Sequence, residues 1–221
     1  GGETGAMRGY KNIVFDIGNV LIRYDPIGFL ERSPYAEQKN EYIRHIFDAE
    51  WWVELDKGTI DEETVFRHLY EQFPDLREGI SYISNHWINE VFSLIEGTSQ
   101  ILTELKEAGY RIYLLSNFGE RGFQKVSKEY AFFEKVDGKI VSYDVKTVKP
   151  EREIYDLLLE RYDLAPHETI YIDDRPENLV VPEEYGILCH HFRNPETLAD
   201  FLGRAGLSVY GGEKGSTGTE D

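Results

Sequence analysis

The stretch KNIVFDIGNVL, residues 11–21, decides the fold class of this chain. Its apolar run Ile13-Val14-Phe15 predicts a short buried strand, and Gly18 predicts a turn soon after it. Asp16 therefore stands where this strand ends. In α/β proteins, ligands and catalytic side chains gather at the carboxyl ends of parallel strands. We expect Asp16 to be held on a rigid element and to serve as a nucleophile or a metal ligand.

Strand and helix patterns alternate beyond about residue 97. Further strands are expected at 110–115, 139–141, 169–172 and 186–189. Helices are expected at 99–109, with Ser99 as N-cap and Gly109 as stop, and at 119–129, 151–162 and 195–202. Together with the strand at residue 12, this alternation predicts an α/β fold, a Rossmann-like doubly wound parallel sheet covered by helices on both faces.

Residues 26–96 differ from the rest, because helical periodicity is the only pattern they show. They predict an all-helical cap inserted after the first strand of the core. The expected division is a core of residues 8–24 and 97–210 and a cap of residues 25–96. Residues 1–6 precede Met7, the only methionine, and are expected to be a cloning remnant. Residues 211–221, rich in Gly, Ser, Thr and Glu, are expected to be a disordered tail.

Composition excludes several classes of protein. No apolar run approaches the ~20 residues of a membrane helix, and no secretory segment opens the chain. The single cysteine, Cys189, excludes an internal disulfide framework. The net charge of −17 and the lack of a basic stripe argue against a nucleic-acid partner. We expect a cytoplasmic protein without membrane contact, in which an anionic substrate is captured locally by backbone N–H groups, a lysine or a divalent cation.

Chemically capable side chains follow four of the expected strands and loops. These are Asp16, the pair Ser116-Asn117, Lys149 and the pair Asp173-Asp174. The first and last segments could supply carboxylates to one cation. The middle two could supply a hydroxyl, backbone donors and an ammonium group to an anion. A nucleophile, hard oxygen ligands for Mg²⁺ and donors around a phosphoryl group are the requirements of phosphoryl transfer.

In this order, the four segments resemble the motifs of the haloacid dehalogenase superfamily of phosphohydrolases. The resemblance covers about residues 8–205 and is carried by FDIGNV at 15–20, LLSN at 114–117, VKPE at 148–151 and YIDD at 171–174. It implies that Asp16 is a nucleophile that forms an aspartyl-phosphate. It also implies that Ser116 and the Asn117 backbone bind the phosphate, and that Lys149 steadies both the nucleophile and the phosphate.

The same resemblance implies a Mg²⁺ cofactor. Its ligands would be Asp16, the backbone carbonyl of Gly18 and Asp174, supported by Asp173 and by Asn178.

Gly18 departs from the usual family pattern. The family's phosphatases usually carry an Asp at this position, whose side chain protonates the leaving oxygen and later activates water. Glycine keeps the carbonyl but lacks that acid, and general acid–base catalysis contributes roughly 10²–10⁴-fold. Asp25 could reach the pocket, although its place before Pro26 favours a hinge or helix-capping role. A subgroup that includes bacterial α-glucose-1-phosphate phosphatases has a similar Asp-Leu-Gly-Asn-Val first motif, which implies sugar-phosphate hydrolysis.

The sequence thus predicts a Mg²⁺-dependent phosphatase that hydrolyses a small phosphate monoester, expected to be a sugar phosphate, and that is a monomer or homodimer. Two alternatives stay open. One is a weakly active or inactive protein that uses the same fold for binding or regulation. The other is a metal-independent 2-haloacid dehalogenase, against which the pair Asp173-Asp174 argues, because a metal-free site gains nothing from two adjacent carboxylates.

Two aromatic or imidazole pairs have simpler interpretations. Trp51 and Trp52 are expected to fill the cap core more readily than to meet a sugar ring. His190 and His191, placed after the last strand, would face opposite ways and so could not share a metal.

Overall fold

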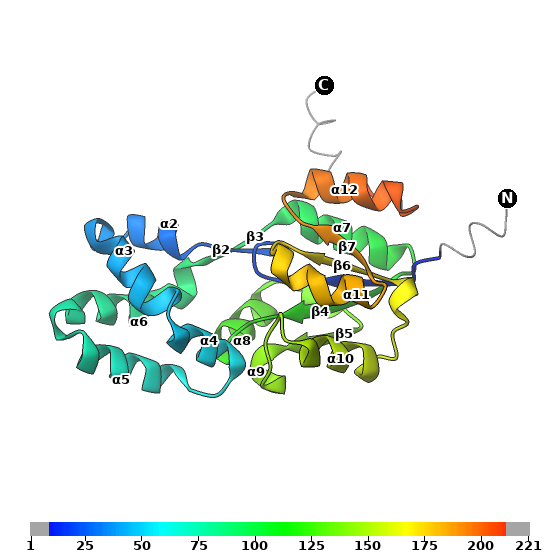
Figure 1. The fold of residues 1–221 in the computed structure, drawn as a ribbon. Helices are drawn as coiled ribbons and strands as arrows, with labels where there is room; N and C mark the ends of the chain where they lie inside the picture. The colour runs from blue at the N-terminus through cyan, green and yellow to red at the C-terminus, as the bar shows by residue number, and fades with distance from the viewer. Residues whose placement is uncertain (1–8, 211–221) are drawn as a thin grey trace, which may run out of the picture.

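A five-stranded parallel sheet forms the centre of the computed structural model, which describes residues 9–210 (Figure 1). The order is β5-β4-β1-β6-β7. The strands are β1 (Asn12–Phe15), β4 (Arg111–Ser116), β5 (Gly138–Val141), β6 (Thr169–Asp173) and β7 (Leu188–His191). Phe15 of β1 lies opposite both Leu114 and Ile172, so the three central strands end at nearly the same level. The expected remnant and tail lie outside the described residues.

Helices cover both faces of this sheet, as the strand alternation requires. Ile13 and Phe15 point to one face, with α7 (Glu96–Glu107), α8 (Glu120–Glu129) and α12 (Pro195–Arg204). Val14 points to the other face, with α10 (Arg152–Arg161) and α11 (Val180–Glu184). Every residue of β1 is buried, which is typical of a parallel strand between two helical layers. The predicted Rossmann-like α/β fold is confirmed.

A second lobe packs beside the carboxyl end of the sheet (Figure 1). Its helices are α2 (Pro26–Glu31), α3 (Lys39–Tyr42), α4 (Glu50–Lys57), α5 (Glu62–Gln72) and α6 (Arg77–Glu90), with one π-helical turn at Ile43–Phe47. They enclose a core of their own that is rich in aromatic rings, among them Trp52, Phe66 and Trp87. We call this lobe the cap.

A two-stranded antiparallel ribbon joins the cap to the core. Strand β2 (Ile22–Tyr24) leads into the cap and β3 (Phe92–Leu94) leads out of it, with Tyr24 paired to Phe92. The expectation that residues 26–96 contain helices alone is therefore wrong at Phe92–Leu94. Three residues are too few to show a two-residue period, and their partner strand is remote in the sequence.

Two boundaries differ from the predicted ones for local reasons. Helix α7 begins at Glu96 instead of Ser99, whose backbone N–H already bonds to the carbonyl of Ile95 at 3.1 Å. Strand β7 begins at Leu188 because Gly186 adopts a left-handed conformation with φ 91°, which ends the preceding helix. As a result, His190 and His191 lie within β7, not after it.

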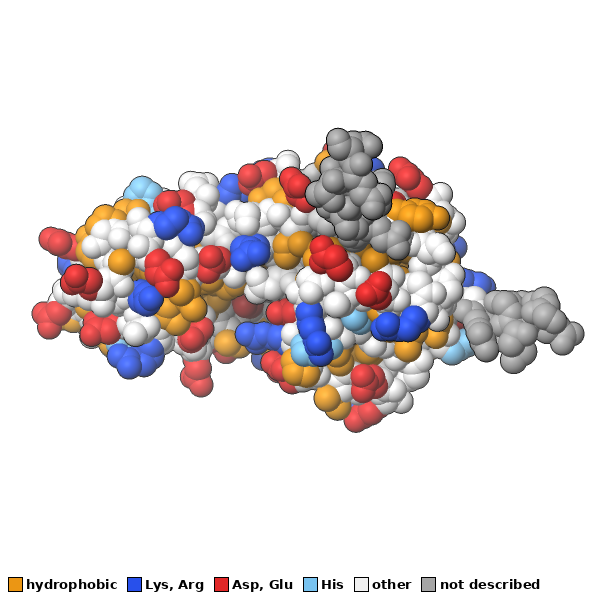
Figure 2. All heavy atoms as spheres, turned by 90° about the horizontal axis from the view of Figure 1, so that it is seen from above, with side chains coloured by type: hydrophobic (Ala, Val, Ile, Leu, Met, Phe, Trp, Pro, Cys, Tyr) orange, Lys and Arg blue, Asp and Glu red, His pale blue; other side chains and the backbone are white. Residues whose placement is uncertain are grey.

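Several short segments complete the described chain. They are helix α9 (Ser142–Val145) and 3-10 turns at Ala36–Gln38, Pro74–Leu76, Ala131–Lys135, Pro166–Glu168 and Pro176–Leu179. Among residues 9–210, no helix combines the length and the apolar character that crossing a bilayer would need. Acidic and basic side chains are interspersed on the face shown in Figure 2.

Candidate active site

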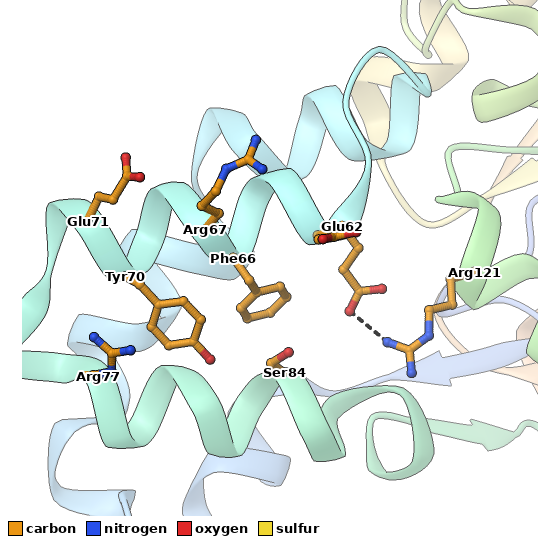
Figure 3. A pocket seen from close by; sticks show the side chains of 9 residues that line it. Glu62, Phe66, Arg67, Tyr70, Glu71, Arg77, Ser84 and Arg121 are labelled. Carbon is orange, nitrogen blue, oxygen red and sulfur yellow. Dashed lines mark hydrogen bonds and ion pairs between the residues drawn. The ribbon is translucent and has the colours of Figure 1, made fainter.

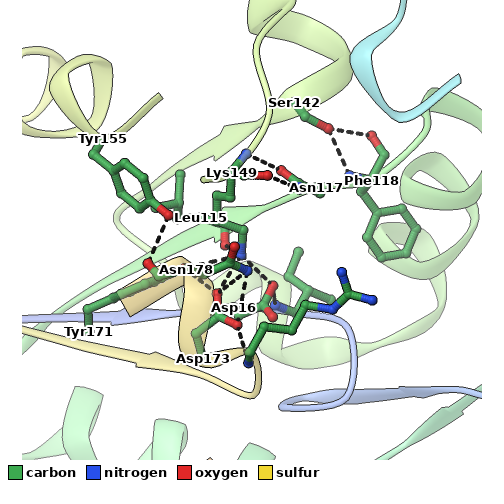
Figure 4. Close-up of polar contacts among 12 residues, drawn as sticks. Asp16, Leu115, Asn117, Phe118, Ser142, Lys149, Tyr155, Tyr171, Asp173 and Asn178 are labelled. Atoms are coloured by element: carbon green, nitrogen blue, oxygen red, sulfur yellow. Dashed lines mark hydrogen bonds and ion pairs between the residues drawn. The ribbon is translucent and has the colours of Figure 1, made fainter. Parts of the chain in front are cut away.

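A cavity of about 1060 Å³ opens between the carboxyl ends of the central strands and the cap. Most of the residues that the sequence singles out line it: Asp16, Gly18, Asn117, Lys149, Asp174 and Asn178. Ser116 and Asp173 are fully buried beside them, at the ends of β4 and β6. The fold thus brings together all the candidate residues, from four separate segments. Figure 4 shows five of them, Asp16, Asn117, Lys149, Asp173 and Asn178.

Asp16 is fixed in place at the end of β1. One of its oxygens, Oδ1, accepts a hydrogen bond from the Ile17 backbone N–H at 2.8 Å and lies 3.0 Å from the Lys149 ammonium. Only 6% of the residue is exposed, yet it borders the cavity. These contacts restrain one carboxylate oxygen, so that a well-oriented carboxylate faces the open space.

Lys149 occupies the centre of the site. Its Nζ donates to the Leu115 carbonyl at 3.0 Å, to the Tyr171 hydroxyl at 3.1 Å and to Asp173 Oδ2 at 2.8 Å, besides its contact with Asp16. The lysine side chain is 1% exposed. Such a network holds the ammonium group in one position and satisfies its charge.

The Asn117 side chain has a positioning contact that the sequence did not predict. Its Nδ2 donates to the Lys149 backbone carbonyl at 3.0 Å, and its Oδ1 accepts from the Lys149 backbone N–H at 2.8 Å. This reciprocal pair ties the loop before α10 to the end of β4. The Asn117 side chain therefore positions Lys149, in addition to the phosphate-binding role expected of the Asn117 backbone N–H.

The adjacent residues Asp173 and Asp174 have different surroundings. Asp173 is fully buried, and protein donors occupy both of its oxygens: Lys149, Tyr171, the Arg175 backbone N–H and the Asn178 amide. Asp174 is half-buried and borders the cavity. One of its carboxylate oxygens lies within 4.8 Å of an oxygen of Asp16. Asp174 is thus the member of the pair that can bind an added ligand, while Asp173 orders the lysine.

Asn178 and Tyr171 complete this buried network. Asn178 donates from Nδ2 to both oxygens of Asp173, at 3.3 and 3.2 Å, while its backbone carbonyl accepts from the Tyr155 hydroxyl at 2.8 Å. Tyr171 donates to Asp173 through its hydroxyl. Within an apolar strand, a tyrosine looks like a core residue, so the sequence offered no sign of this polar contact.

The protonation of these groups follows from burial and charge. Burial raises the pKa of Asp16 well above its ordinary value, and Asp173 adds to the shift while Lys149 opposes it. Burial likewise raises the pKa of Asp174. Burial would lower the pKa of Lys149, but Asp16 and Asp173 outweigh it and raise the pKa. Burial would raise the pKa of Asp173, but Lys149 outweighs it and lowers the pKa.

This arrangement fits a divalent cation. Oxygens of Asp16, Asp173 and Asp174 lie within 4.8 Å of one another. When its three carboxylates are ionised, the cluster with its one ammonium group carries a net charge of −2, which a bound Mg²⁺ would neutralise. Hard carboxylate and carbonyl oxygens are the ligands that Mg²⁺ prefers. Asp16, Asp174 and the Gly18 carbonyl are the groups at the cavity that could hold it.

The hydroxyl of Ser116 indicates an anion-binding site beside this cluster. Its hydroxyl is buried and has no hydrogen-bond partner among the described residues. Leaving a buried hydroxyl unsatisfied costs about 1–3 kcal/mol. An oxygen of a bound phosphate would satisfy it.

Other residues considered from the sequence have structural roles. Asp25 Oδ1 caps α2 by accepting the Gly28 backbone N–H at 2.9 Å. Trp52 is buried in the cap core and also borders the cavity, whereas Trp51 stacks on His68. Burial raises the pKa of the Cys189 thiol to about 12, so this thiol stays protonated at neutral pH.

The chain belongs to the haloacid dehalogenase-like hydrolases, because a model of that family matches residues 10–181. It is 25% identical to the sesquiterpene phosphatase astK of Aspergillus oryzae, over 82% of this chain and 89% of that protein. It is 24% identical to flavin mononucleotide hydrolase 1 of Arabidopsis thaliana, over 95% of this chain and 83% of that protein.

A solved structure has a similar fold over most of the chain. It is the HAD family enzyme BT-2542 from Bacteroides thetaiotaomicron in complex with magnesium and inorganic phosphate. The TM-score is 0.65 at 25% identity, over 84% of this chain and 96% of that chain. The predicted family and the predicted enzyme class, a hydrolase, are confirmed.

Proposed function

We propose that this chain is a Mg²⁺-dependent phosphatase that hydrolyses a small phosphate monoester through a phosphorylated Asp16. The observation that carries the proposal is the cluster of Asp16, Asp174, Lys149 and the unsatisfied Ser116 hydroxyl around one cavity. The solved relative in complex with magnesium and phosphate supports it.

In the proposed reaction, a carboxylate oxygen of Asp16 attacks phosphorus while the ester oxygen leaves. Ser116, Lys149 and the Asn117 backbone N–H hold the phosphoryl oxygens. A bound Mg²⁺, held by Asp16, Asp174 and the Gly18 carbonyl, would neutralise negative charge on the phosphoryl group. Asp173 and Asn178 keep the lysine in place. Water then hydrolyses the aspartyl-phosphate and regenerates Asp16.

Two classes of leaving group fit this proposal. The similarity of the first motif to the α-glucose-1-phosphate phosphatase subgroup favours a sugar phosphate. The cavity wall favours a second candidate, an apolar or aromatic leaving group, because Tyr24, Trp52, Phe92 and Phe118 border it. The names of the two curated relatives, which act on a sesquiterpene and on a flavin nucleotide, support the second candidate.

A release assay for inorganic phosphate tests the function. The panel should contain sugar phosphates, flavin mononucleotide and farnesyl phosphate, each with Mg²⁺ or with EDTA. We expect turnover that requires Mg²⁺ and disappears in Asp16→Asn. Absence of turnover with every ester would favour a binding or regulatory role instead. Release of halide from a 2-haloacid without metal would favour the dehalogenase alternative.

A further inference from the structure

Asp56 is a cap residue that reaches the active-site cavity. It lies near the C-terminal end of α4 and borders the same cavity as Asp16 and Gly18. Asp56 could not be selected from the sequence alone, because it is remote from all four motifs. The fold of the cap places Asp56 on the wall of the cavity that Gly18 also borders.

Asp56 lies next to residues from several loops of the core. Its Oδ1 lies 3.7 Å from the place that a Cβ of Gly119, three residues after Ser116, would take, and Arg175, the residue after Asp174, borders the same cavity. The Asp56 backbone carbonyl accepts from the Ser142 hydroxyl. Asp56 is therefore attached to the loops that carry the phosphate-binding and metal-binding candidates.

Further contacts fix the end of α4 against the core. Lys146 Nζ donates to the Gly58 carbonyl at 2.7 Å, and Lys57 lies 3.7 Å from Glu151. On the cap surface, Arg121 of the core reaches Glu62 at 2.8 Å, beside a hollow of about 900 Å³ (Figure 3). The cap therefore presents Asp56 to the cavity in a defined position.

The surroundings of Asp56 suit a proton donor. Burial raises its pKa to about 7, although Arg175 and the Gly119 N–H act in the opposite direction. The Tyr24 hydroxyl interacts with it as well, and burial, Asp56 and Asp48 raise the pKa of that hydroxyl well above its ordinary value. At neutral pH the carboxyl holds its proton part of the time and can also release it. A general acid works best with its pKa near the working pH.

We propose that Asp56 is the general acid and base of this enzyme, supplied by the cap in place of the side chain that Gly18 lacks. The inference rests on the proposed phosphatase function. When Asp16 attacks phosphorus and the bond to the ester oxygen breaks, the Asp56 carboxyl gives its proton to that oxygen, and the alcohol leaves. The resulting Asp56 carboxylate then takes a proton from the attacking water. The bond between phosphorus and Asp16 breaks, phosphate is released, and Asp56 is protonated again.

The test compares aryl phosphates whose leaving groups differ in basicity, from p-nitrophenyl to p-methoxyphenyl phosphate. The measured quantity is kcat/KM, which reports the first transfer alone if that step is irreversible. With Asp56 present, kcat/KM is expected to depend weakly on the leaving group. In Asp56→Asn, it is expected to be nearly unchanged for p-nitrophenyl phosphate and to fall roughly 10²-fold or more for p-methoxyphenyl phosphate.

A second readout isolates the base. Without it, hydrolysis of the aspartyl-phosphate becomes slow, while p-nitrophenolate still leaves unaided. Asp56→Asn is therefore expected to release one equivalent of p-nitrophenolate per enzyme in a burst, followed by slow turnover. Asp56→Glu, which keeps an acid, is expected to restore the weak dependence on the leaving group and to abolish the burst.

The matched control is Glu54→Gln. Glu54 is an exposed carboxylate on the same helix that bonds to Thr59 and does not border the cavity. It is expected to behave like the wild type. Thermal melts of both variants show whether the fold is kept. An equal loss for all aryl phosphates in Asp56→Asn, or no loss at all, overturns the role of Asp56. Failure of the wild type to hydrolyse any of them overturns the proposed function itself.

Discussion

Replacing Lys149 by methionine separates the charge of this residue from its apolar stem. Methionine keeps a long unbranched chain but removes the ammonium group, which lies 3.0 Å from Asp16 Oδ1 and 2.8 Å from Asp173 Oδ2. The lysine side chain is 1% exposed and that of Asp173 is 0% exposed, so water cannot readily replace the lost partner. The variant therefore leaves a carboxylate buried without its counter-charge.

The expected cost follows from this burial. Breaking a buried ion pair by removing one partner destabilises a protein by about 3–5 kcal/mol. Folded domains have roughly 5–15 kcal/mol of stability, so a weakened fold is expected, not an unfolded chain. Without the lysine, the folded-state pKa of Asp173 rises above its unfolded value. That penalty is complete at high pH and is relieved as pH falls, because the carboxyl can then be protonated. The loss is therefore expected to be about 1–3 kcal/mol smaller at pH 5 than at pH 8.

Urea unfolding followed by far-UV circular dichroism measures both effects, at pH 8 and pH 5 with EDTA present. Lys57→Met is the matched control, because Lys57 lies 3.7 Å from Glu151 in a pair that is partly exposed on both sides. It is expected to cost less than about 1 kcal/mol at either pH. The reasoning is refuted if Lys149→Met costs no more than this control, or if its cost is the same at both pH values.

Three further predictions follow from the site. Mg²⁺ at 100 times its Kd should raise the free energy of unfolding of the wild type by about 2.7 kcal/mol, which corresponds to a rise of about 5–11 °C in Tm. In thermal melts of Asp174→Asn, most of this Mg²⁺-dependent rise in Tm should be lost. Asn117→Ala removes both hydrogen bonds to the Lys149 backbone and should cost about 1–3 kcal/mol in urea unfolding, together with a fall in kcat. A Cβ at Gly18 would meet no atom within 4 Å, so Gly18→Asp should fold normally and change the wild-type rate by no more than a few-fold. Added to Asp56→Asn, the same substitution should raise the rate. If the double variant is no faster than Asp56→Asn, the assignment of the missing acid is contradicted.

Much of the core was predictable because its signals are local. Three apolar residues before Asp16 suffice to mark a buried strand, and parallel strands must end at one edge. Once Asp16, Ser116 and Asp173 are placed at strand ends, their convergence follows from the sheet register. The predicted helix-capping role of Asp25 is also confirmed, since an aspartate before Pro26 has a strong local preference for that role.

The parts that escaped prediction depend on distant contacts. The ribbon strand Phe92–Leu94 exists only through its pairing with Ile22–Tyr24. The hydroxyl of Tyr171 and the amide of Asn117 are recognisable as supports of Lys149 only when the loops are folded. Asp56 is the clearest case. Nothing in the pattern around it distinguishes it from an exposed helical carboxylate, because its environment is created by Gly119 and Arg175 of the core.

The β2–β3 ribbon has a consequence for modular engineering. Tyr24 and Phe92 are partners across an antiparallel pair, where facing Cα atoms are about 4.5–5.5 Å apart. A two-residue turn can span such a gap. The chain could therefore be closed directly across the ribbon, which would delete the cap and keep the order of the core strands. Such a shortened chain would retain Asp16, Ser116, Lys149 and Asp174, whereas Asp56 would be lost with the cap. Grafting the cap of a relative onto the β2–β3 ribbon would therefore replace the cap side of the cavity wall and the proposed acid in a single step.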